Sequence, residues 1–187
     1  LLYVHGAADD YTLPKPCEDY VKKIQSKHLE ALTSALKEMG ANVKLKENII
    51  KILPTKKLNG IKIQTAPYPG FPTDLQAQMM ALMSLAEGNS QIKENIFENR
   101  FMHVPELNRL GAKIKVKKDM AYITGSRNFK GAQVMASDLR ASVSLVLAAL
   151  CAEGESEINR VYHLDRGYEK IENTLGKLGP SIKRKKY

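Results

Sequence analysis

The sequence is poor in cysteine and in aromatic residues, and both shortages exclude classes of protein. Two cysteines, Cys17 and Cys151, are too few for a disulfide framework or a zinc site, so a reducing compartment is expected. Cys151, within "LVLAALCAEG", is interpreted as a small buried residue. With no tryptophan and four phenylalanines, the chain offers few of the stacking platforms that single-strand nucleic-acid binders use. Its four histidines are not spaced like a set of metal ligands.

Long apolar runs are also missing. No segment reaches the length of a membrane-spanning helix, and the first residues do not resemble a signal peptide, so we expect a cytoplasmic protein with no membrane partner. The chain starts at Leu1, in residues typical of a strand, and not at a methionine. We therefore expect it to be a piece of a longer protein.

The charge balance is strongly positive. With a formal net charge of +9 and an isoelectric point near 9.4, a charged partner is expected to be an anion. Part of the excess lies in the terminal run "KRKK", Lys183 to Lys186, which we interpret as a solvated tail. The other lysines recur at solvent-facing positions of the expected helices and hairpins, which argues against a nucleic-acid partner.

One unit occurs twice in the chain. The segment "PTDLQAQMMALMSLAEGNSQIKENIFENRFMHVPELNRLGAKIKV", from Pro72, matches "ASDLRASVSLVLAALCAEGESEINRVYHLDRGYEKIENTLGKLGPSIKR", from Ala136. Each has a Thr/Ser-Asp-Leu start, an apolar helix ending in Ala-Glu-Gly, a polar strand, a loop carrying an arginine, a second helix, Leu-Gly and a basic strand. A partial third copy, "KHLEALTSALKEMGANVKLKENIIKIL", precedes them. We predict a single lobe of three units, at about residues 1–65, 66–129 and 130–187.

Two kinds of helix are expected in these units. Each second helix has one apolar stripe and ends before a glycine suited to a left-handed cap: Gly40, Gly111 and Gly179. The first helices, which begin at Asp74 and Asp138, are apolar or small almost all round, as buried central helices are. The strands after the second helices alternate polar and apolar residues, so one face can meet solvent. The pattern predicts an α/β (α+β) fold with helices inside, sheets outside and pseudo-threefold symmetry.

The N-termini of the equivalent first helices should lie at the same end of the fold. Because helix N-termini carry partial positive charge and free N–H groups, that end is suited to anions. The segment "TAPYPGFPTDLQAQ", Thr65 to Gln78, leads into one of these helices through prolines and a glycine. Its Asp74 has two interpretations, a helix N-cap or a carboxylate held rigidly at the mouth of a pocket.

Four stretches carry a resemblance to a known family. They are "PGFPTDLQAQ" from Pro69, "FENRFMHVPELNRLGA" from Phe97, "GAQVMASDLRASVSLVLAAL" from Gly131 and "RVYHLDRGYEKIENTLGKLGP" from Arg160. Together they make the chain, from about Leu29 onward, similar to the UDP-N-acetylglucosamine enolpyruvyl transferases. The sister family, the shikimate-pathway enolpyruvyl transferases, is similar in fold but not in the Phe-Glu-Asn-Arg-Phe-Met-His-Val-Pro-Glu-Leu string.

This resemblance implies one lobe of a two-lobed enzyme, each lobe being an inside-out α/β barrel of three units. It implies transfer of the enolpyruvyl group of phosphoenolpyruvate to the 3-hydroxyl of UDP-N-acetylglucosamine, through a tetrahedral ketal and with release of phosphate. That reaction is the first committed step of bacterial peptidoglycan synthesis and needs no metal or other cofactor. It requires a base near the 3-hydroxyl, an acid for the methylene carbon, and cations around the phosphate and carboxylate.

The resemblance also implies roles for single residues. Asp74 matches the carboxylate beside the sugar 3-hydroxyl, the candidate base. Arg166 matches an arginine that helps to hold phosphoenolpyruvate, although an arginine directly after an aspartate is also typical of a local ion pair. Arg100 and Arg140 match further arginines that line the cleft. Ile96 falls where the family contacts the sugar nucleotide, a contact that its backbone could make.

Two further residues, Asp138 and His103, are also interpreted from the sequence. Arg140 lies in a first helical turn, where a positive side chain is unfavourable, and this exception indicates a functional role. Asp138 is interpreted as the cap of its helix and the orienting partner of Arg140, with a second base as the alternative. His103 lies in the family string, but Pro105 and Glu106 behind it are typical of a helix start, so we expect a structural role.

The chain also departs from the family. Members open with a Lys-Asn pair and carry, in their other lobe, a loop cysteine that acts as the acid, and neither feature is present here. We assign that role to neither Cys17 nor Cys151, and residues 1–28 fit the family poorly. The missing N-terminal lobe is therefore an expected partner, and the chain alone is expected to be inactive. An alternative is a basic binding or regulatory remnant of the same fold without catalysis.

Overall fold

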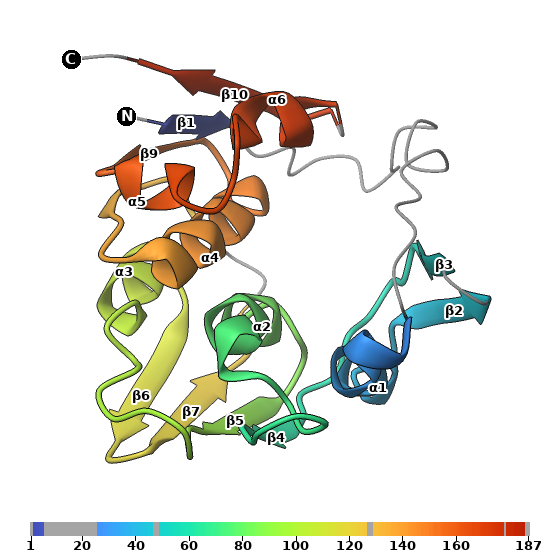
Figure 1. Ribbon diagram of the computed structural model, residues 1–187. Coiled ribbons are helices and arrows are strands. Elements are labelled where there is room, and N and C mark those ends of the chain that lie inside the picture. Colours follow the sequence, from blue (N-terminus) through green and yellow to red (C-terminus); the bar gives the residue numbers. More distant parts are fainter. Residues whose placement is uncertain (1, 6–25, 47–48, 127–128, 178, 186–187) are drawn as a thin grey trace.

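The computed structural model describes residues 2–5, 26–46, 49–126, 129–177 and 179–185 (Figure 1). Its α-helices are α1 (Glu30–Glu38), α2 (Gln76–Met83), α3 (Val104–Arg109), α4 (Leu139–Leu150), α5 (Tyr162–Asp165) and α6 (Ile171–Gly176). Short 3-10 turns precede the first two: η2 (Ser26–Leu29) and η3 (Thr73–Leu75). Its strands are β1 (Leu2–His5), β2 (Asn42–Lys46), β3 (Ile49–Leu53), β4 (Lys62–Gln64), β5 (Asn89–Lys93), β6 (Lys113–Lys117), β7 (Met120–Thr124), β8 (Gln133–Met135), β9 (Glu155–Asn159) and β10 (Ser181–Arg184). Over these ranges, the structure contains no helix with the length and apolar character needed to cross a membrane.

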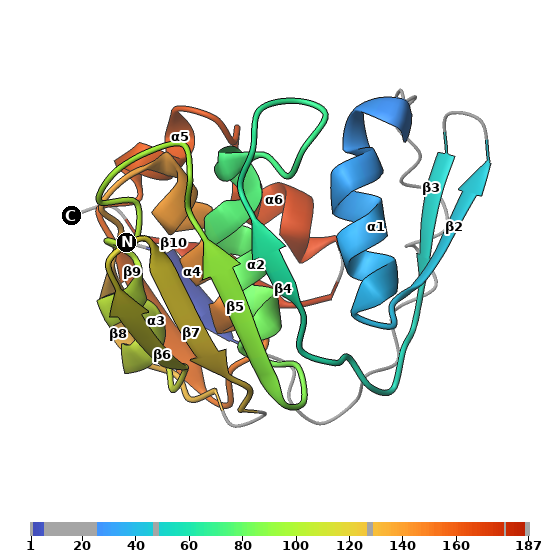
Figure 2. The same ribbon diagram turned by 90° about the horizontal axis from the view of Figure 1, so that it is seen from below.

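Helices α2 and α4 form the centre of the fold. They pack against each other and lie between the two four-stranded sheets, while α1 and the β2–β3 hairpin stand to one side (Figures 1 and 2). The run Ala141–Val146 of α4 is buried, as are Met79, Met80 and Met83 of α2. The expectation of central helices that are apolar all round is therefore confirmed, because such helices have no polar face to turn to solvent.

The two four-stranded sheets have the same construction. Their strand orders are β4-β5-β7-β6 and β8-β9-β1-β10. In each sheet the first two strands are parallel and the remaining neighbours antiparallel. Strand β1, from the start of the chain, thus takes the place that β7 has in the other sheet, and β10 takes the place of β6. Within the described residues, the partial copy contributes η2, α1 and the separate hairpin of β2 and β3.

The glycines predicted to follow the second helices all have left-handed backbones. Gly40, Gly111 and Gly179 have φ angles of 91°, 103° and 107°. For α1 and α3 the glycine comes directly after the C-cap residue, as a left-handed cap requires. Helix α6 is shorter than expected, because it ends at Gly176 with Lys177 as its cap, so Gly179 lies beyond the cap.

The α+β class and the mixed order of helices and strands agree with the expectation from sequence. The division into units of about 1–65, 66–129 and 130–187 stays a prediction: β4, near the end of the first range, pairs with β5 of the second, and β1 pairs with strands of the third. Cys17 lies outside the described residues.

The terminal basic run is only in part the tail that we expected. Lys183 and Arg184 belong to β10, and the guanidinium of Arg184 donates to Asp165 and Glu172 over distances of 2.8 to 3.1 Å. Arg184 therefore joins β10 to α5 and α6, because it bonds a carboxylate on each helix.

Candidate active site

The chain reaches Asp74 through a loop that leaves the edge of a sheet and returns to it. Thr65, directly after β4, forms a parallel bridge with Phe71, and the Ala66 N–H donates to the Phe71 carbonyl at 3.0 Å. Gly70 lies inside the loop, where an added Cβ would come within 2.6 Å of the Ala66 Cβ. A side chain does not fit there without a shift, so the glycine allows the loop to close tightly before Asp74.

Asp74 is not a helix N-cap. It is the middle residue of η3, the N-cap positions of η3 and α2 are Pro72 and Leu75, and neither of these makes a side-chain cap bond. The Asp74 side chain is 62% exposed. The N-cap interpretation is therefore wrong for this residue, because the chain enters α2 through a 3-10 turn that directs the carboxylate outward.

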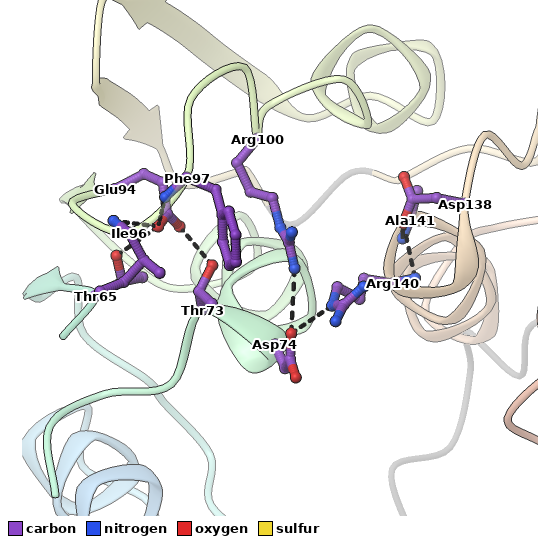
Figure 3. A network of polar contacts seen from close by, with 10 residues as sticks. All are labelled: Thr65, Thr73, Asp74, Glu94, Ile96, Phe97, Arg100, Asp138, Arg140 and Ala141. Carbon is purple, nitrogen blue, oxygen red and sulfur yellow. Dashed lines mark hydrogen bonds and ion pairs between the residues drawn. The ribbon is translucent and has the colours of Figure 1, made fainter. Parts of the chain in front are cut away.

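The Asp74 carboxylate lies between two arginines from different units (Figure 3). The Arg100 Nη2 donates to Asp74 Oδ1 at 3.1 Å, and the Arg140 Nε donates to the same oxygen at 2.5 Å. Both contacts use Oδ1, so Oδ2 has no hydrogen-bond donor within the described ranges. Three of the residues that the resemblance implicates thus meet at one place.

Arg140 reaches Asp74 from the first turn of α4. Its helix is capped by Asp138, whose Oδ1 accepts from the backbone N–H groups of Arg140 and Ala141 at 2.9 and 3.0 Å. Burial alone would raise the pKa of Asp138, but the hydrogen bonds from Ala141, Ser137 and Arg140 lower it below its ordinary value. The expected cap is confirmed. Because Arg140 contacts Asp74, the beginnings of α2 and α4 lie at the same end of the fold, as predicted.

Arg100 is held by the loop that follows β5. Its guanidinium carbon lies 4.8 Å from the centre of the Phe97 ring, a cation–π distance. We expected the Ile96 backbone to contact a sugar nucleotide, and its N–H already donates to Glu94 Oε1 at 3.0 Å. The Ile96 carbonyl is the backbone group that could still bond a ligand.

Sequence reasoning missed Glu94. The residue is only 4% exposed, and its carboxylate joins the loop before Asp74 to the loop that carries Arg100 (Figure 3). The alternation of buried and more exposed residues along β5 could have identified it. Ser90 and Ile92 point into the core, and Glu94 continues the same two-residue period. A charged residue at an inward position is unusual and requires hydrogen-bond partners.

Arg166 does not join the Asp74 cluster. It is the C-cap of α5, it is exposed, and it forms no ion pair with any described residue. Its predicted alternative, a local pair with Asp165, is not found because Asp165 pairs with Arg184. The next residue, Gly167, lies against Leu139 at the start of α4, where an added Cβ would be 3.0 Å from the Leu139 side chain. Arg166 is thus near the same end of α4 as Arg140.

The other residues singled out from the sequence are not in this cluster. His103 is 3% exposed, and its Nε2 has no hydrogen-bond partner in the described part of the chain. Burial lowers the pKa of His103 to about 4, against an opposing effect of Asp138 and with a smaller contribution from Arg100. Cys151 is half-buried, and burial raises the pKa of its thiol. Among the described residues, no group of histidine, cysteine and carboxylate side chains is arranged to hold a metal ion.

The arrangement combines a proton acceptor with fixed positive charge. An exposed carboxylate with one free oxygen can take a proton from a bound hydroxyl. Two guanidinium groups can hold phosphate or carboxylate groups beside it. The site therefore suits a reaction in which a hydroxyl group attacks an anionic substrate.

The chain is similar to proteins of one family over most of its length. A model of the EPSP synthase (3-phosphoshikimate 1-carboxyvinyltransferase) family matches residues 18–175. A UDP-N-acetylglucosamine 1-carboxyvinyltransferase of Pelagibacter ubique is 58% identical over 161 residues, which are 86% of this chain and 39% of that protein. The protein of the same name from Myxococcus xanthus is 51% identical over 166 residues, 89% of this chain and 40% of its own length. The chain thus spans about two fifths of these curated relatives.

Solved structures show the same relationship. The enolpyruvyl transferase NikO from Streptomyces tendae has a TM-score of 0.77 and 31% identity, covering 83% of this chain and 36% of NikO. An EPSP synthase from Acinetobacter baumannii, at 18% identity and a TM-score of 0.67, shares the fold over 84% of this chain and 40% of its own. Since the family model covers well over half of the sequence, we conclude that the chain belongs to the EPSP synthase (3-phosphoshikimate 1-carboxyvinyltransferase) family.

Proposed function

We propose that this chain is one lobe of an enzyme that transfers the enolpyruvyl group of phosphoenolpyruvate to the 3-hydroxyl of UDP-N-acetylglucosamine and releases phosphate. The observation that carries the proposal is the exposed carboxylate of Asp74, which lies at the start of α2 and is shared by Arg100, from the loop after β5, and Arg140, from the first turn of α4. The similarity to relatives named for this reaction supports it. The reaction belongs to peptidoglycan synthesis, and we place it in the cytoplasm.

In this proposal Asp74 is the base. As the sugar oxygen bonds to C2 of phosphoenolpyruvate, its proton passes to the carboxylate, while an acid protonates the methylene carbon. The free Oδ2 supports this role, because both arginines contact Oδ1. In the second step a proton leaves the new methyl group, and phosphate departs with the electrons of its bond to C2.

The arginines bind the anionic substrate. A guanidinium group offers paired N–H donors that match the oxygens of a carboxylate or phosphate. Arg100 and Arg140 can exchange part of their contact with Asp74 for contact with the substrate, and the exposed Arg166 adds a third guanidinium. Ile96 contacts the sugar nucleotide through its carbonyl, since its N–H is bonded to Glu94.

The second lobe supplies what this chain lacks. The chain spans about two fifths of its curated relatives, so the acid and the facing wall of the cleft come from the rest of such a protein. Closure of two lobes excludes water and brings reacting groups together. We therefore expect the chain alone to bind the sugar nucleotide weakly and not to turn over substrate.

The test is a phosphate-release assay with phosphoenolpyruvate and UDP-N-acetylglucosamine. The chain is assayed alone and mixed with a separately produced N-terminal lobe of a relative such as the Pelagibacter ubique protein. We expect activity only in the mixture, and a loss of about 100-fold or more in Asp74→Ala. Glu157→Ala, on β9 and away from Asp74, is the matched control and should stay active.

Each other outcome has a clear meaning. Turnover by the chain alone would contradict the one-lobe proposal. If no phosphate is released by a mixture whose two lobes are shown to associate, a binding or regulatory remnant of the fold is favoured. Full activity of Asp74→Ala would show that Asp74 is not the base.

A further inference from the structure

Glu94 is a buried residue, and both oxygens of its carboxylate accept hydrogen bonds. It follows β5 directly and is 4% exposed. Its Oε1 accepts from the Thr65 hydroxyl at 2.7 Å and from the backbone N–H groups of Ile96 and Phe97 at 3.0 and 3.2 Å. Its Oε2 accepts from the Thr73 hydroxyl at 3.0 Å. Because a backbone N–H can only donate, these bonds require an acceptor at Oε1.

The four donors come from two separate loops. Thr65 and Thr73 belong to the connection between β4 and α2, whereas Ile96 and Phe97 belong to the loop after β5. A further bond, from the Asn95 N–H to the Thr65 hydroxyl at 2.9 Å, ties the same loops together. The Asn95 side chain adds a bond from its amide to the Thr65 carbonyl at 3.1 Å. Glu94 is the charged side chain among these links, and it bonds both loops (Figure 3).

Both loops lead directly to the candidate active site. Thr73 is the residue before Asp74, and the Phe97 ring lies under the guanidinium of Arg100. Asp74 and Arg100 contact each other at 3.1 Å. Glu94 therefore holds the neighbours of both members of this ion pair, although it contacts neither of them.

The fold by itself does not require this carboxylate. The ends of the first two strands are equivalent in the two complete units, as matching backbone hydrogen bonds show: Thr65 N to Lys93 O at 2.9 Å and Ala136 N to Asn159 O at 3.0 Å. The residue directly after Lys93 is Glu94, and the residue directly after Asn159 is Arg160, which is exposed. The unit without Asp74 and Arg100 thus forms the same strand pair without a buried acid.

We propose that Glu94 is a positioning residue, which sets the separation of Asp74 and Arg100 by bonding the loops that carry them. The proposal rests on the proposed function for its effect on activity, but its structural content can be tested without it. Glu94 contacts no substrate in this scheme and acts through Asp74.

The first test is structural and uses the chain as it is. Crystal structures of Glu94→Ala, Glu94→Gln and Glu157→Ala are compared with the unchanged protein. In Glu94→Ala we expect the contact between Arg100 and Asp74 to be lost. In Glu94→Gln it should be kept, because the amide oxygen can accept the backbone N–H groups while the amide nitrogen donates to the Thr73 hydroxyl. Glu157, which accepts from Gln133 in the other sheet, is the matched control and its variant should keep the contact.

The second test uses the mixture with the N-terminal lobe. Glu94→Ala should lower kcat by about 10- to 100-fold, because a misplaced base loses orientation, with a smaller change in KM. In an Asp74→Asn background the same change should cause no further loss of kcat, whereas a role in stability alone would give the same loss in both backgrounds. Thr73→Val, compared with Thr73→Ser, removes only the Oε2 bond and serves if Glu94→Ala does not fold.

The outcomes separate the two proposals. An unchanged contact between Arg100 and Asp74 in a folded Glu94→Ala or Thr73→Val protein would overturn the positioning role. An inactive mixture of the unchanged lobes would contradict the proposed function, while the crystal structures would still decide the role of Glu94.

Discussion

Asp74 and Asp138 occupy the same place in the same Thr/Ser-Asp-Leu motif and make different contacts. Asp138 follows shortly after β8 and bonds the free N–H groups of α4. Asp74 follows β4 after a longer loop, enters through a 3-10 turn and leaves its carboxylate to two arginines. The same motif therefore caps a helix after the short connection and not after the longer one that ends in a 3-10 turn.

This difference predicts unequal effects on stability. Asp138→Ala should lower the free energy of unfolding by about 1 kcal/mol, because two N–H groups of α4 lose their acceptor. Asp74→Ala should change it by less than about 0.5 kcal/mol, since exposed ion pairs contribute little. Urea unfolding followed by circular dichroism measures both. Equal losses in the two variants would show that Asp74 also has a capping role.

His103 predicts a pH dependence of stability. Its folded pKa is about 4, lowered by burial from an ordinary 6.5, so between these values the unfolded chain binds a proton that the folded chain does not. The contribution is complete above about pH 6.5 and is lost as pH falls toward 4. We expect the free energy of unfolding to drop by about 2 kcal/mol from about pH 7.5 to about pH 5.

Urea unfolding at several pH values measures this dependence, and His103→Gln is the control. The variant cannot titrate in this window, so its curve should be flatter than that of the unchanged protein by the same amount. Parallel curves would mean that His103 is not the group responsible.

At the scale of elements, the two complete units repeat one close backbone contact. Gly60 precedes β4 and Gly131 precedes β8, and an added Cβ would come within 2.3 Å of the Asn89 carbonyl oxygen or 2.2 Å of the Glu155 carbonyl oxygen. These glycines allow the first two strands of each sheet to begin their parallel pairing. The sequence contains both glycines, but the need for them depends on a strand that is distant in the chain.

A pair of glycine substitutions tests this. Gly60→Ala should destabilise the protein by about 1–3 kcal/mol, because the obstacle is backbone and cannot rotate away. Gly176→Ala, at the end of α6 with nothing within 4 Å of the added Cβ, should be neutral or stabilising by up to about 1 kcal/mol. Thermal unfolding compares the two. A neutral Gly60→Ala would show that the strands can separate locally at little cost.

At the scale of the whole molecule, the last unit is completed by the start of the chain. β1 lies between β9 and β10 and pairs with both over four residues on each side. Its Leu2 is fully buried. The two ends of the chain therefore depend on each other, although the repeat in the sequence predicts no such contact.

Removal of residues 1–5 should expose the backbone of two strands. We expect amide hydrogen exchange in β9 and β10 to become at least about 10-fold faster, because an unpaired strand opens locally, while β5 and β7 serve as an internal control. Hydrogen exchange with mass spectrometry measures this on the truncated chain. Unchanged exchange in β9 and β10 would contradict the position of β1 in the sheet.

The sequence by itself determined the class of fold, the buried central helices and the left-handed glycines, and its repeated motif placed the starts of the two central helices at one end. These features depend on local periodicity, on caps and on a motif that occurs twice, all of which are carried by neighbouring residues. The common position of Asp74, Arg100 and Arg140 was implied by the resemblance to the family. Only the tertiary structure decided that Asp74 does not cap its helix, that Arg166 stays apart from the cluster, that β1 completes the last sheet and that Glu94 joins two loops. Each of these depends on contacts between residues far apart in the chain, where the length of a loop or the partner of a buried acid is set by packing and not by local pattern.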